Sequence, residues 1–385
     1  MDHRQMPDSK DVNIEINVGS WTAAGKAVPS QLTGISTPRK MSVGVALLHT
    51  ALRTRPPQST GMSLADYWAW LRYGPAISDS ADLRLRPEWS EIDPHQKTVL
   101  SDDLGMGFTT YLLARTLKFK SFADTLRFVN VTNPGNYKFL HVSKNGKYKA
   151  PDFVAFDSAG GSGNVNVVEC KGTQSSRKAL LKAIEDGIPQ KQNLASIGGS
   201  KINHSLVAGL FIPAHNTKET ALIHISDPED IELVNVLAGI ELKRIQTAII
   251  QIDLAQHFAL MGLYSIANAL ASTDTSQVDR LVDVDSSELD LLHPIGNAMW
   301  RQFEIAFPFP TTVSAFGQER IRRVRFTMAC PTSIYNGLLK SPSLEATLGN
   351  LVASANSNEW EEKSGESEMT LVTPLGFRLN LAYLS

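Results

Sequence analysis

Two strand-like runs near the middle of the chain, separated by a short turn-forming segment, restrict the fold more than any other feature. The runs cover residues 151–157 and 165–171, and both contain several residues that favour strands. The segment between them, 158–164, reads Ser-Ala-Gly-Gly-Ser-Gly-Asn and consists almost wholly of turn-forming residues. This arrangement predicts a β-hairpin.

Helical patterns flank the hairpin. Residues 101–117 have apolar positions at helical spacing behind three polar residues that suit a helix start, so we expect a capped helix there. A second helix is predicted over 176–186, ending at Gly187. Two further strands, 206–212 and 221–226, complete an α/β unit of about 130 residues.

The length of 385 residues predicts more than one domain. We divide the chain into an N-terminal, partly loop-rich region (1–90), the α/β core (91–230) and a C-terminal module (231–385) of unknown role. The C-terminal module is predicted to be α+β, because helical spacing to about residue 270 gives way to strand-like runs and polar loops.

Chemically active side chains gather on the hairpin. Because side chains alternate along a strand, Glu169 and Lys171 project from one face about 7 Å apart, while Cys170 points to the other face. Asp152 opens the first run, where hairpin pairing can bring its carboxylate beside Glu169. Two carboxylates suit Mg²⁺, which binds one or two carboxylates together with water and substrate phosphates. The lysine can orient or help deprotonate an attacking water and offset the charge on a phosphorane.

Pro151-Asp152, sixteen intervening residues and Glu169-Cys170-Lys171 resemble the motif of the PD-(D/E)xK nuclease superfamily. That superfamily includes many restriction endonucleases, RecB-type nucleases and Holliday-junction resolvases. The resemblance covers roughly residues 95–226 and implies a restriction-endonuclease-like core, in which helices flank a mixed central sheet. It also implies that Asp152 and Glu169 bind metal and that Lys171 is catalytic. The backbone carbonyl of Cys170 can reach the same ion, and Mn²⁺ can substitute for Mg²⁺.

Two further residues are suggested by subsets of this superfamily. Some members add an acidic residue from the preceding helix, for which Asp102 or Asp103 is the candidate. RecB-like members add a glutamine from the following helix, and Gln190 has a suitable position. Pro189 disturbs a helix there and no partner tyrosine follows, which is a departure from the RecB-like pattern.

Local basic clusters surround the proposed site. Lys147 and Lys149 precede Asp152, and Arg177 and Lys178 follow Lys171; a polyanion approaching the site would meet these charges. The alternative is that these basic residues are ordinary solvent-exposed charges without a role in binding. A third cluster contains Arg323 and Arg325, which strand alternation places on one face. This cluster either contacts a DNA backbone or protects an edge strand by charge.

Several functional classes have no support. The chain has 37 basic and 39 acidic residues, so it is not a globally basic nucleic-acid binder. Residues 104–110 partly match a phosphate-binding loop, but Phe108 replaces the essential lysine, and close helix packing explains the two glycines better. Neither the two cysteines nor the histidine spacing predicts zinc. No membrane span or secretory signal is expected, so we predict a cytoplasmic protein.

These observations favour a Mg²⁺-dependent nuclease that hydrolyses phosphodiester bonds, and we expect its substrate to be DNA. By analogy of fold alone, its setting would be bacterial restriction or anti-phage defence, with a homodimer or a defence protein as partner. Two alternatives stay open at this point. One is a catalytically silent nucleic-acid-binding scaffold, and the other is an adaptor in which the hairpin is structural and residues 231–385 bind a protein.

Overall fold

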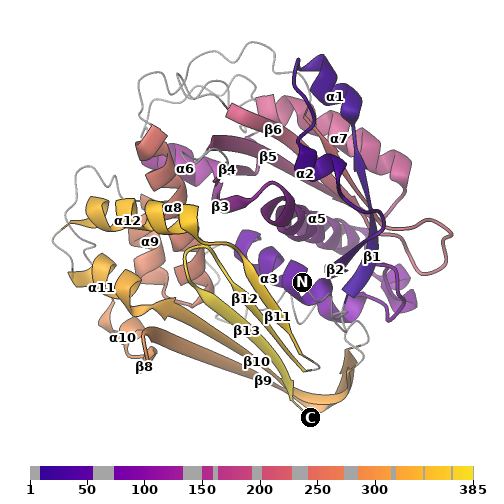
Figure 1. The fold of residues 1–385 in the computed structure, drawn as a ribbon. Helices are drawn as coiled ribbons and strands as arrows, with labels where there is room; N and C mark the ends of the chain where they lie inside the picture. The colour runs from indigo at the N-terminus through magenta and orange to yellow at the C-terminus, as the bar shows by residue number, and fades with distance from the viewer. Residues whose placement is uncertain are drawn as a thin grey trace.

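A computed structural model of the chain describes residues 9–54, 73–132, 150–158, 164–192, 202–227, 242–272, 285–313, 318–340, 343–365 and 367–384. Two β-sheets organise these residues, one of seven strands and one of six, with helices between and around them (Figure 1). None of the described helices is both long enough and apolar enough to pass through a bilayer.

The seven-stranded sheet is mixed, with strand order β2-β1-β7-β6-β5-β4-β3. Two neighbouring pairs, β1–β7 and β5–β6, are parallel, and the other four are antiparallel. Its strands are β1 (Ser9–Ile16), β2 (Arg39–Ser42), β3 (Phe119–Asp124), β4 (Phe153–Asp157), β5 (Asn164–Thr173), β6 (Ile202–Phe211) and β7 (Leu222–Ser226).

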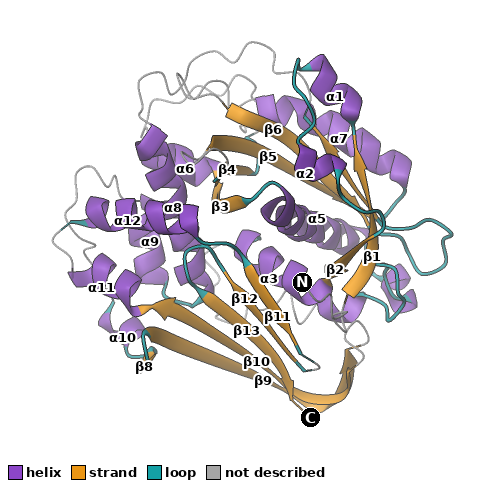
Figure 2. Cartoon of the chain, viewed as in Figure 1, coloured by secondary structure: helices purple, strands orange, loops and turns teal. Residues whose placement is uncertain are grey.

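Helices cover both faces of this sheet (Figure 2). On one face α5 (Pro94–Thr116) packs against β5 and β6, and α3 (Val43–Arg53) packs against α5. On the other face α7 (Arg177–Gln192) crosses β5 and β6. The predicted α/β class, with a mixed central sheet flanked by helices, is therefore confirmed.

The strand predictions in the core are confirmed. β4 and β5 pair antiparallel, with Phe153 opposite Val168 and Asp157 opposite Asn164, so they form the predicted hairpin. β6 and β7, the two later strands, also pair with each other.

Both core helices differ from their predicted limits. α5 begins at Pro94, two turns before the predicted start, because the Asp93 side chain caps it by accepting a hydrogen bond from the His95 N–H (2.8 Å). Asp102 and Asp103 consequently lie inside the helix. α7 continues to Gln192 instead of ending at Gly187, and it includes Pro189.

The six-stranded sheet is wholly antiparallel, with strand order β11-β12-β13-β10-β9-β8. Its inner face packs toward α3 through β12, while alternate residues of its strands face outward. Its strands are β8 (His293–Ile295), β9 (Ala298–Val313), β10 (Gln318–Pro331), β11 (Glu361–Ser364), β12 (Glu368–Val372) and β13 (Arg378–Leu384).

The remaining helices lie in the N-terminal part of the chain, beside β3 and around the C-terminal sheet. They are α1 (Val18–Ala23), α2 (Ser30–Thr33), α6 (Thr125–Thr132), α8 (Leu242–Leu260), α9 (Tyr264–Ser272), α10 (Ser286–Leu289), α11 (Thr332–Lys340), α12 (Leu344–Ser357) and the 3₁₀ turns η3 (Gly74–Ala76) and η4 (Pro87–Glu91).

The three predicted regions are joined more closely than a linear division suggests. β1, from the N-terminal region, pairs with β7 of the core, with Asn13 opposite Leu222. One continuous cluster of buried apolar side chains extends from β1 to β13. The division at 90 and 230 stays a prediction, but residues on both sides of each boundary share one hydrophobic core.

Candidate active site

The hairpin brings the three predicted catalytic side chains together where β4 begins and β5 nears its end. Glu169 and Lys171 project from the α7 face of β5, and Lys171 Nζ forms a hydrogen-bonded ion pair with Glu169 Oε1. Cys170 projects from the opposite face, where Thr109 Oγ1 of α5 donates a hydrogen bond to its Sγ (3.2 Å). The predicted alternation along this strand is confirmed.

Asp152 and Glu169 are connected across the hairpin through backbone groups. The Asp152 N–H donates to Glu169 Oε2 (3.2 Å), and the Cys170 N–H donates to Asp152 Oδ2 (2.7 Å). Each carboxylate is thus held by the strand that carries the other. Asp152 Oδ1 accepts no hydrogen bond from the described residues.

The Glu169–Lys171 pair is enclosed by the fold. The Glu169 side chain is 2% exposed and that of Lys171 is 22% exposed. The pair lies beneath α7 at Gly187, where a Cβ would come within 3.0 Å of Lys171 Cε and 3.3 Å of Glu169 Cγ. Gly187 is therefore a residue of the site that the sequence interpretation assigned only to a helix end. A glycine inside a helical pattern indicates a close approach and could have suggested this contact.

Enclosure shifts the ionisation of all three groups. Burial raises the pKa of Asp152 to about 6, despite the opposing Cys170 N–H and Lys171 charge. Burial, followed by the charge of Asp152, raises the pKa of Glu169 to about 8. Burial alone would lower the pKa of Lys171, but the neighbouring Glu169 and Asp152 outweigh it and raise that pKa. The site is thus a protonated lysine beside two carboxyl groups that burial and mutual repulsion disfavour as anions.

The preceding helix brings Asp102 into the electrostatic environment of the site. Burial raises the pKa of Asp102 and the Lys171 charge opposes that shift, while the charge of Asp102 raises the pKa of Asp152. Asp103 faces another direction, since its Oδ2 accepts a hydrogen bond from the Tyr73 hydroxyl (2.5 Å). Of the two candidates left open by the sequence, Asp102 is the one whose charge acts on Asp152 and Lys171.

The donor set suits a magnesium ion better than zinc. In the part of the chain that the structure describes, no three His, Cys, Asp or Glu side chains are close enough together to hold a metal by themselves. Mg²⁺ needs only one or two carboxylates, with water and substrate oxygens as its other ligands. Asp152 and Glu169 meet this requirement, and a cation beside them would offset the burial and charge repulsion that raise their pKa values. The Cys170 thiol faces away, so only its backbone carbonyl stays a predicted ligand.

The other predicted residues have varied locations. Gln190 lies in α7, one turn beyond Gly187, and its side chain is outside the described part. Arg177 forms an ion pair with Glu15 (2.7 Å). Glu15 lies three strands across the sheet from Lys171, so their backbones are about 14 Å apart. Lys178 is exposed in the first turn of α7. Lys147 and Lys149 are outside the described residues.

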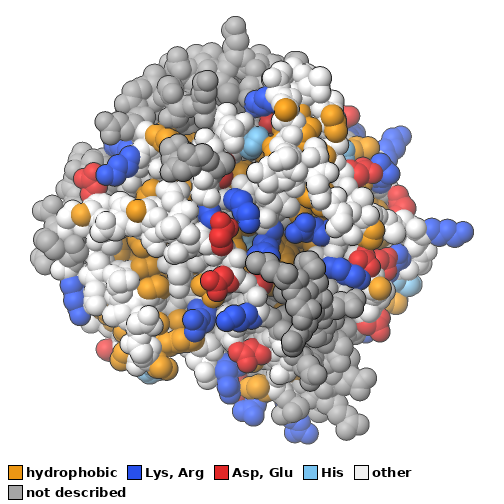
Figure 3. All heavy atoms as spheres, in the orientation of Figure 1, with side chains coloured by type: hydrophobic (Ala, Val, Ile, Leu, Met, Phe, Trp, Pro, Cys, Tyr) orange, Lys and Arg blue, Asp and Glu red, His pale blue; other side chains and the backbone are white. Residues whose placement is uncertain are grey.

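Arg323 and Arg325 project from one face of β10, as predicted. Both bind Glu304 of β9, at 3.0 and 3.2 Å. β10 lies between β13 and β9, so the interpretation of this cluster as a protected edge strand is wrong. The face drawn in Figure 3 shows Lys and Arg interspersed with Asp and Glu, without one continuous basic field.

The glycine-containing segment 104–110 lies within α5, where that helix packs against α3 and β5. The packing interpretation of these glycines is therefore confirmed.

A comparison of the chain with protein-family models, curated proteins and solved structures finds no significant match. The functional argument consequently depends on the geometry of the site.

Proposed function

We propose that the protein is a metal-dependent nuclease with a PD-(D/E)xK-type site, and that Asp152, Glu169 and Lys171 carry the reaction. The observation that supports this most directly is the convergence of these three side chains at the ends of β4 and β5. A restriction-endonuclease-like core and a DNA substrate, with a setting in bacterial defence, are the finer parts of the same proposal.

Lys171 acts through its positive charge. Its raised pKa keeps the ammonium protonated at neutral pH, so it cannot serve as the base that removes a proton from water. A buried ammonium can instead orient the attacking water and stabilise the negative charge that develops on the phosphoryl oxygens. The ion pair with Glu169 holds Nζ where that charge would form.

Asp152 and Glu169 would hold Mg²⁺ or Mn²⁺, with the Cys170 carbonyl as a third protein ligand. When bound, the metal would supply an activated water and Lewis-acid stabilisation. The hydrogen bonds from the Asp152 and Cys170 N–H groups fix the two carboxylates before any cation arrives. Asp102, whose backbone lies against Gly172 near the end of β5, adds negative charge that favours a cation in the same place.

A cleavage assay tests this proposal. Wild type and Lys171→Ala are incubated with supercoiled plasmid, linear duplex, single-stranded DNA and RNA, each with Mg²⁺, Mn²⁺ or EDTA. We expect metal-dependent cleavage by wild type and a loss of about 100-fold or more in Lys171→Ala, the usual effect of removing one charge-stabilising donor. Lys218→Ala, at an exposed lysine between β6 and β7, is the matched control and should cleave normally.

Calorimetry separates the alternatives. Mg²⁺ binding by wild type that is lost in Asp152→Asn and Glu169→Gln would support the site. Nucleic-acid binding without cleavage or metal binding would overturn the nuclease and favour the silent scaffold. Absence of cleavage, metal binding and nucleic-acid binding would favour the adaptor.

A further inference from the structure

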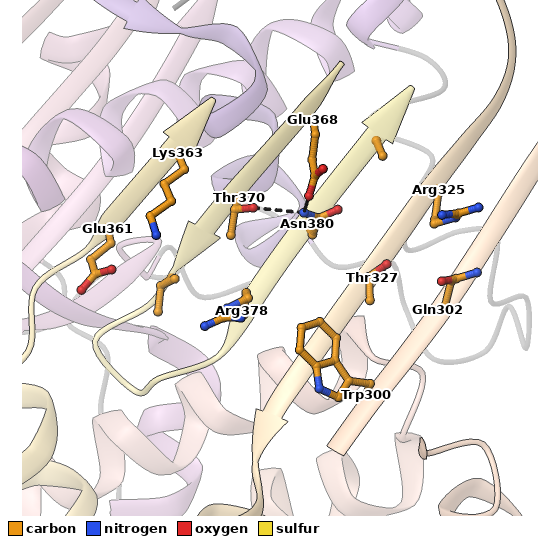
Figure 4. A pocket seen from close by; sticks show the side chains of 12 residues that line it. Trp300, Gln302, Arg325, Thr327, Glu361, Lys363, Glu368, Thr370, Arg378 and Asn380 are labelled. Atoms are coloured by element: carbon orange, nitrogen blue, oxygen red, sulfur yellow. Dashed lines mark hydrogen bonds between the residues drawn. The ribbon is translucent and has the colours of Figure 1, made fainter. Parts of the chain in front are cut away.

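The outer face of the six-stranded sheet carries a shallow pocket with a volume of about 420 Å³. Figure 4 shows its side chains rising from neighbouring strands toward the same side. Its residues alternate with buried ones such as Phe326 and Leu379, whose side chains belong to the core beneath the sheet. We call it the outer-sheet pocket. The lining residues that matter for its chemistry are Trp300, Gln302, Thr327, Lys363, Arg378 and Asn380.

Strand register arranges these side chains in two parallel rows. The first row crosses five strands and contains only polar residues, in the order Lys363, Thr370, Asn380, Thr327, Gln302. With neighbouring strands about 4.8 Å apart, this row extends about 19 Å.

The second row contains the one indole of the pocket. Its order is Glu361, Val372, Arg378, Ala329, Trp300. Ala329 is small, so the Arg378 guanidinium reaches across it to the Trp300 ring, with 5.8 Å from Cζ to the ring centroid. The Arg378 guanidinium therefore lies over one face of the indole, and Trp300 stays partly exposed where it lines the pocket.

Several of these groups have unused binding capacity. Among the described residues, Lys363 and Arg378 form no ion pair, and the side chains of Gln302 and Thr327 form no hydrogen bond. Glu361 is two strands from Arg378, about 10 Å between backbones, and the two side chains form no ion pair. Asn380 is the exception, because its amide donates to Thr370 Oγ1 (3.0 Å) and to Glu368.

We propose that the outer-sheet pocket binds single-stranded nucleic acid. Trp300 offers a ring on which one unpaired base can stack, and Arg378 and Lys363 offer cations for the flanking phosphates. Gln302, Thr327 and the Asn380 carbonyl supply donors and acceptors for base edges. An unpaired strand combines an aromatic face, a polar edge and regularly spaced negative charge, which are the three features that this pocket complements.

The same observations disfavour two other occupants. Stacking on Trp300 needs an exposed base face, which a duplex does not offer along its length. A protein interface needs an apolar centre with few Lys and Glu residues, whereas this pocket contains one indole among polar and charged side chains.

This inference rests on the proposed function only for the role of the pocket, which would be to hold a strand that the carboxylate site cleaves. Binding itself needs neither metal nor Lys171. It can therefore be measured in EDTA, where a metal-dependent reaction cannot proceed.

The test measures fluorescence anisotropy of the full-length chain with labelled 12-nucleotide oligothymidylate, oligouridylate and a 12-base-pair duplex, all in EDTA. We expect wild type to bind single strands more tightly than the duplex, and the DNA and RNA arms to identify the preferred sugar. Trp300→Ala should weaken binding about tenfold, as expected for one lost stacking contact. Trp300→Phe keeps a ring and should stay within about threefold of wild type.

Arg378→Ala should weaken binding and reduce its salt dependence, because one phosphate contact is lost. Lys340→Ala removes an exposed lysine from α11 and is the matched charge control. Equal binding by wild type, Trp300→Ala and Arg378→Ala would overturn the inference, as would absent binding by a folded wild type. Self-association lost in Trp300→Ala, without nucleic-acid binding, would also overturn it and assign the face to a second copy.

The two proposals fail in distinguishable ways. Trp300-dependent binding without any cleavage would remove the nuclease but retain this pocket. Cleavage that depends on Lys171 but not on Trp300, with Trp300→Ala binding single strands as wild type does, would retain the nuclease but remove this pocket.

Discussion

Lys171 can extend beneath α7 because Gly187 carries no side chain at the crossing point. A methyl group there would be 3.0 Å from Lys171 Cε and 3.1 Å from Val207 Cγ1. Both distances are tighter than ordinary contacts, and the lysine stem is the more flexible neighbour. The lysine would therefore move before the helix does.

This reasoning predicts that Gly187→Ala reduces cleavage without unfolding the protein. Replacing a helical glycine with alanine contributes about 1 kcal/mol of stability, which offsets much of the crowding. A shift of about 1 Å at a catalytic group can cost about 100-fold in rate, so we expect single-turnover cleavage to fall between 10- and 100-fold. Glu185→Ala, an exposed position on the same helix, is the control. A variant that cleaves at the wild-type rate would show that Gly187 does not fix Nζ.

At the residue scale, strand periodicity was sufficient to predict which side chains share a face. It placed Glu169 with Lys171 and turned Cys170 away, as observed. The choice between Asp102 and Asp103 could not be made in the same way. Adjacent helix positions differ by about 100° in direction, and the face that meets the sheet depends on contacts from β5.

At the scale of elements, the position of α5 relative to β5 depends on a backbone contact. A Cβ on Gly172 would be 1.7 Å from the Ser101 carbonyl oxygen and 2.9 Å from the Asp102 amide nitrogen. These are backbone atoms of a buried helix and cannot rotate away. The same contact holds Asp102 next to the end of β5, so packing and site geometry are linked here.

Gly172→Ala should therefore destabilise the protein by about 3 kcal/mol or more, since overpacking against backbone forces α5 and β5 apart. Gly349→Ala in α12 is the matched control, because the nearest neighbouring atom to the added Cβ would be Lys243 Cε at 3.9 Å. That control should raise stability by about 0.5–1 kcal/mol. Urea unfolding midpoints measure both changes. Equal, small effects would mean that α5 adjusts freely to β5.

Element boundaries were predicted less well than element types, for identifiable reasons. Asp93-Pro94 combines a capping side chain with a proline in the first turn, a start signal stronger than the one at residues 101–103. The alternation of Val12, Ile14 and Ile16 indicates the strand β1, although our division of the chain places these residues in a partly loop-rich region. The passage of α7 through Pro189 has no local signal, because tertiary packing against β5 and β6 sustains it.

At the scale of the whole molecule, the C-terminal sheet is fixed to the core through polar and aromatic contacts. The Trp360 indole N–H donates to the Phe119 carbonyl (2.8 Å), and the Tyr111 hydroxyl donates to Glu362 (2.9 Å). His49 of α3 packs between them, with ring centroids 4.7 Å from Trp360 and 5.5 Å from Tyr111. The contacts of Trp360 and Glu362 join residues more than 200 positions apart, and single-strand periodicity carries no information about them.

His49 makes this junction sensitive to pH. Burial lowers its pKa well below the usual value, and the charges of Arg53, Arg115 and His257 lower it further. The unfolded chain binds a proton near pH 6.5 while the folded chain does not, so protonation favours unfolding as the pH falls below about 6.5. Asp152 and Glu169 have raised pKa values and act in the opposite direction, so the total slope of stability with pH does not isolate His49.

His49→Phe isolates this contribution, because it keeps an aromatic ring against Trp360 and leaves the carboxyl groups unchanged. Its unfolding free energy, relative to wild type, should rise by about 1 kcal/mol as the pH is lowered from 6.5 to 5.5. Urea unfolding at both pH values, in EDTA, gives this double difference. A double difference near zero would show that His49 titrates alike in the folded and unfolded chain, and that the junction opens to water before the rest of the molecule. A full effect would show that the two sheets stay closed around His49 down to pH 5.5, as their shared core requires.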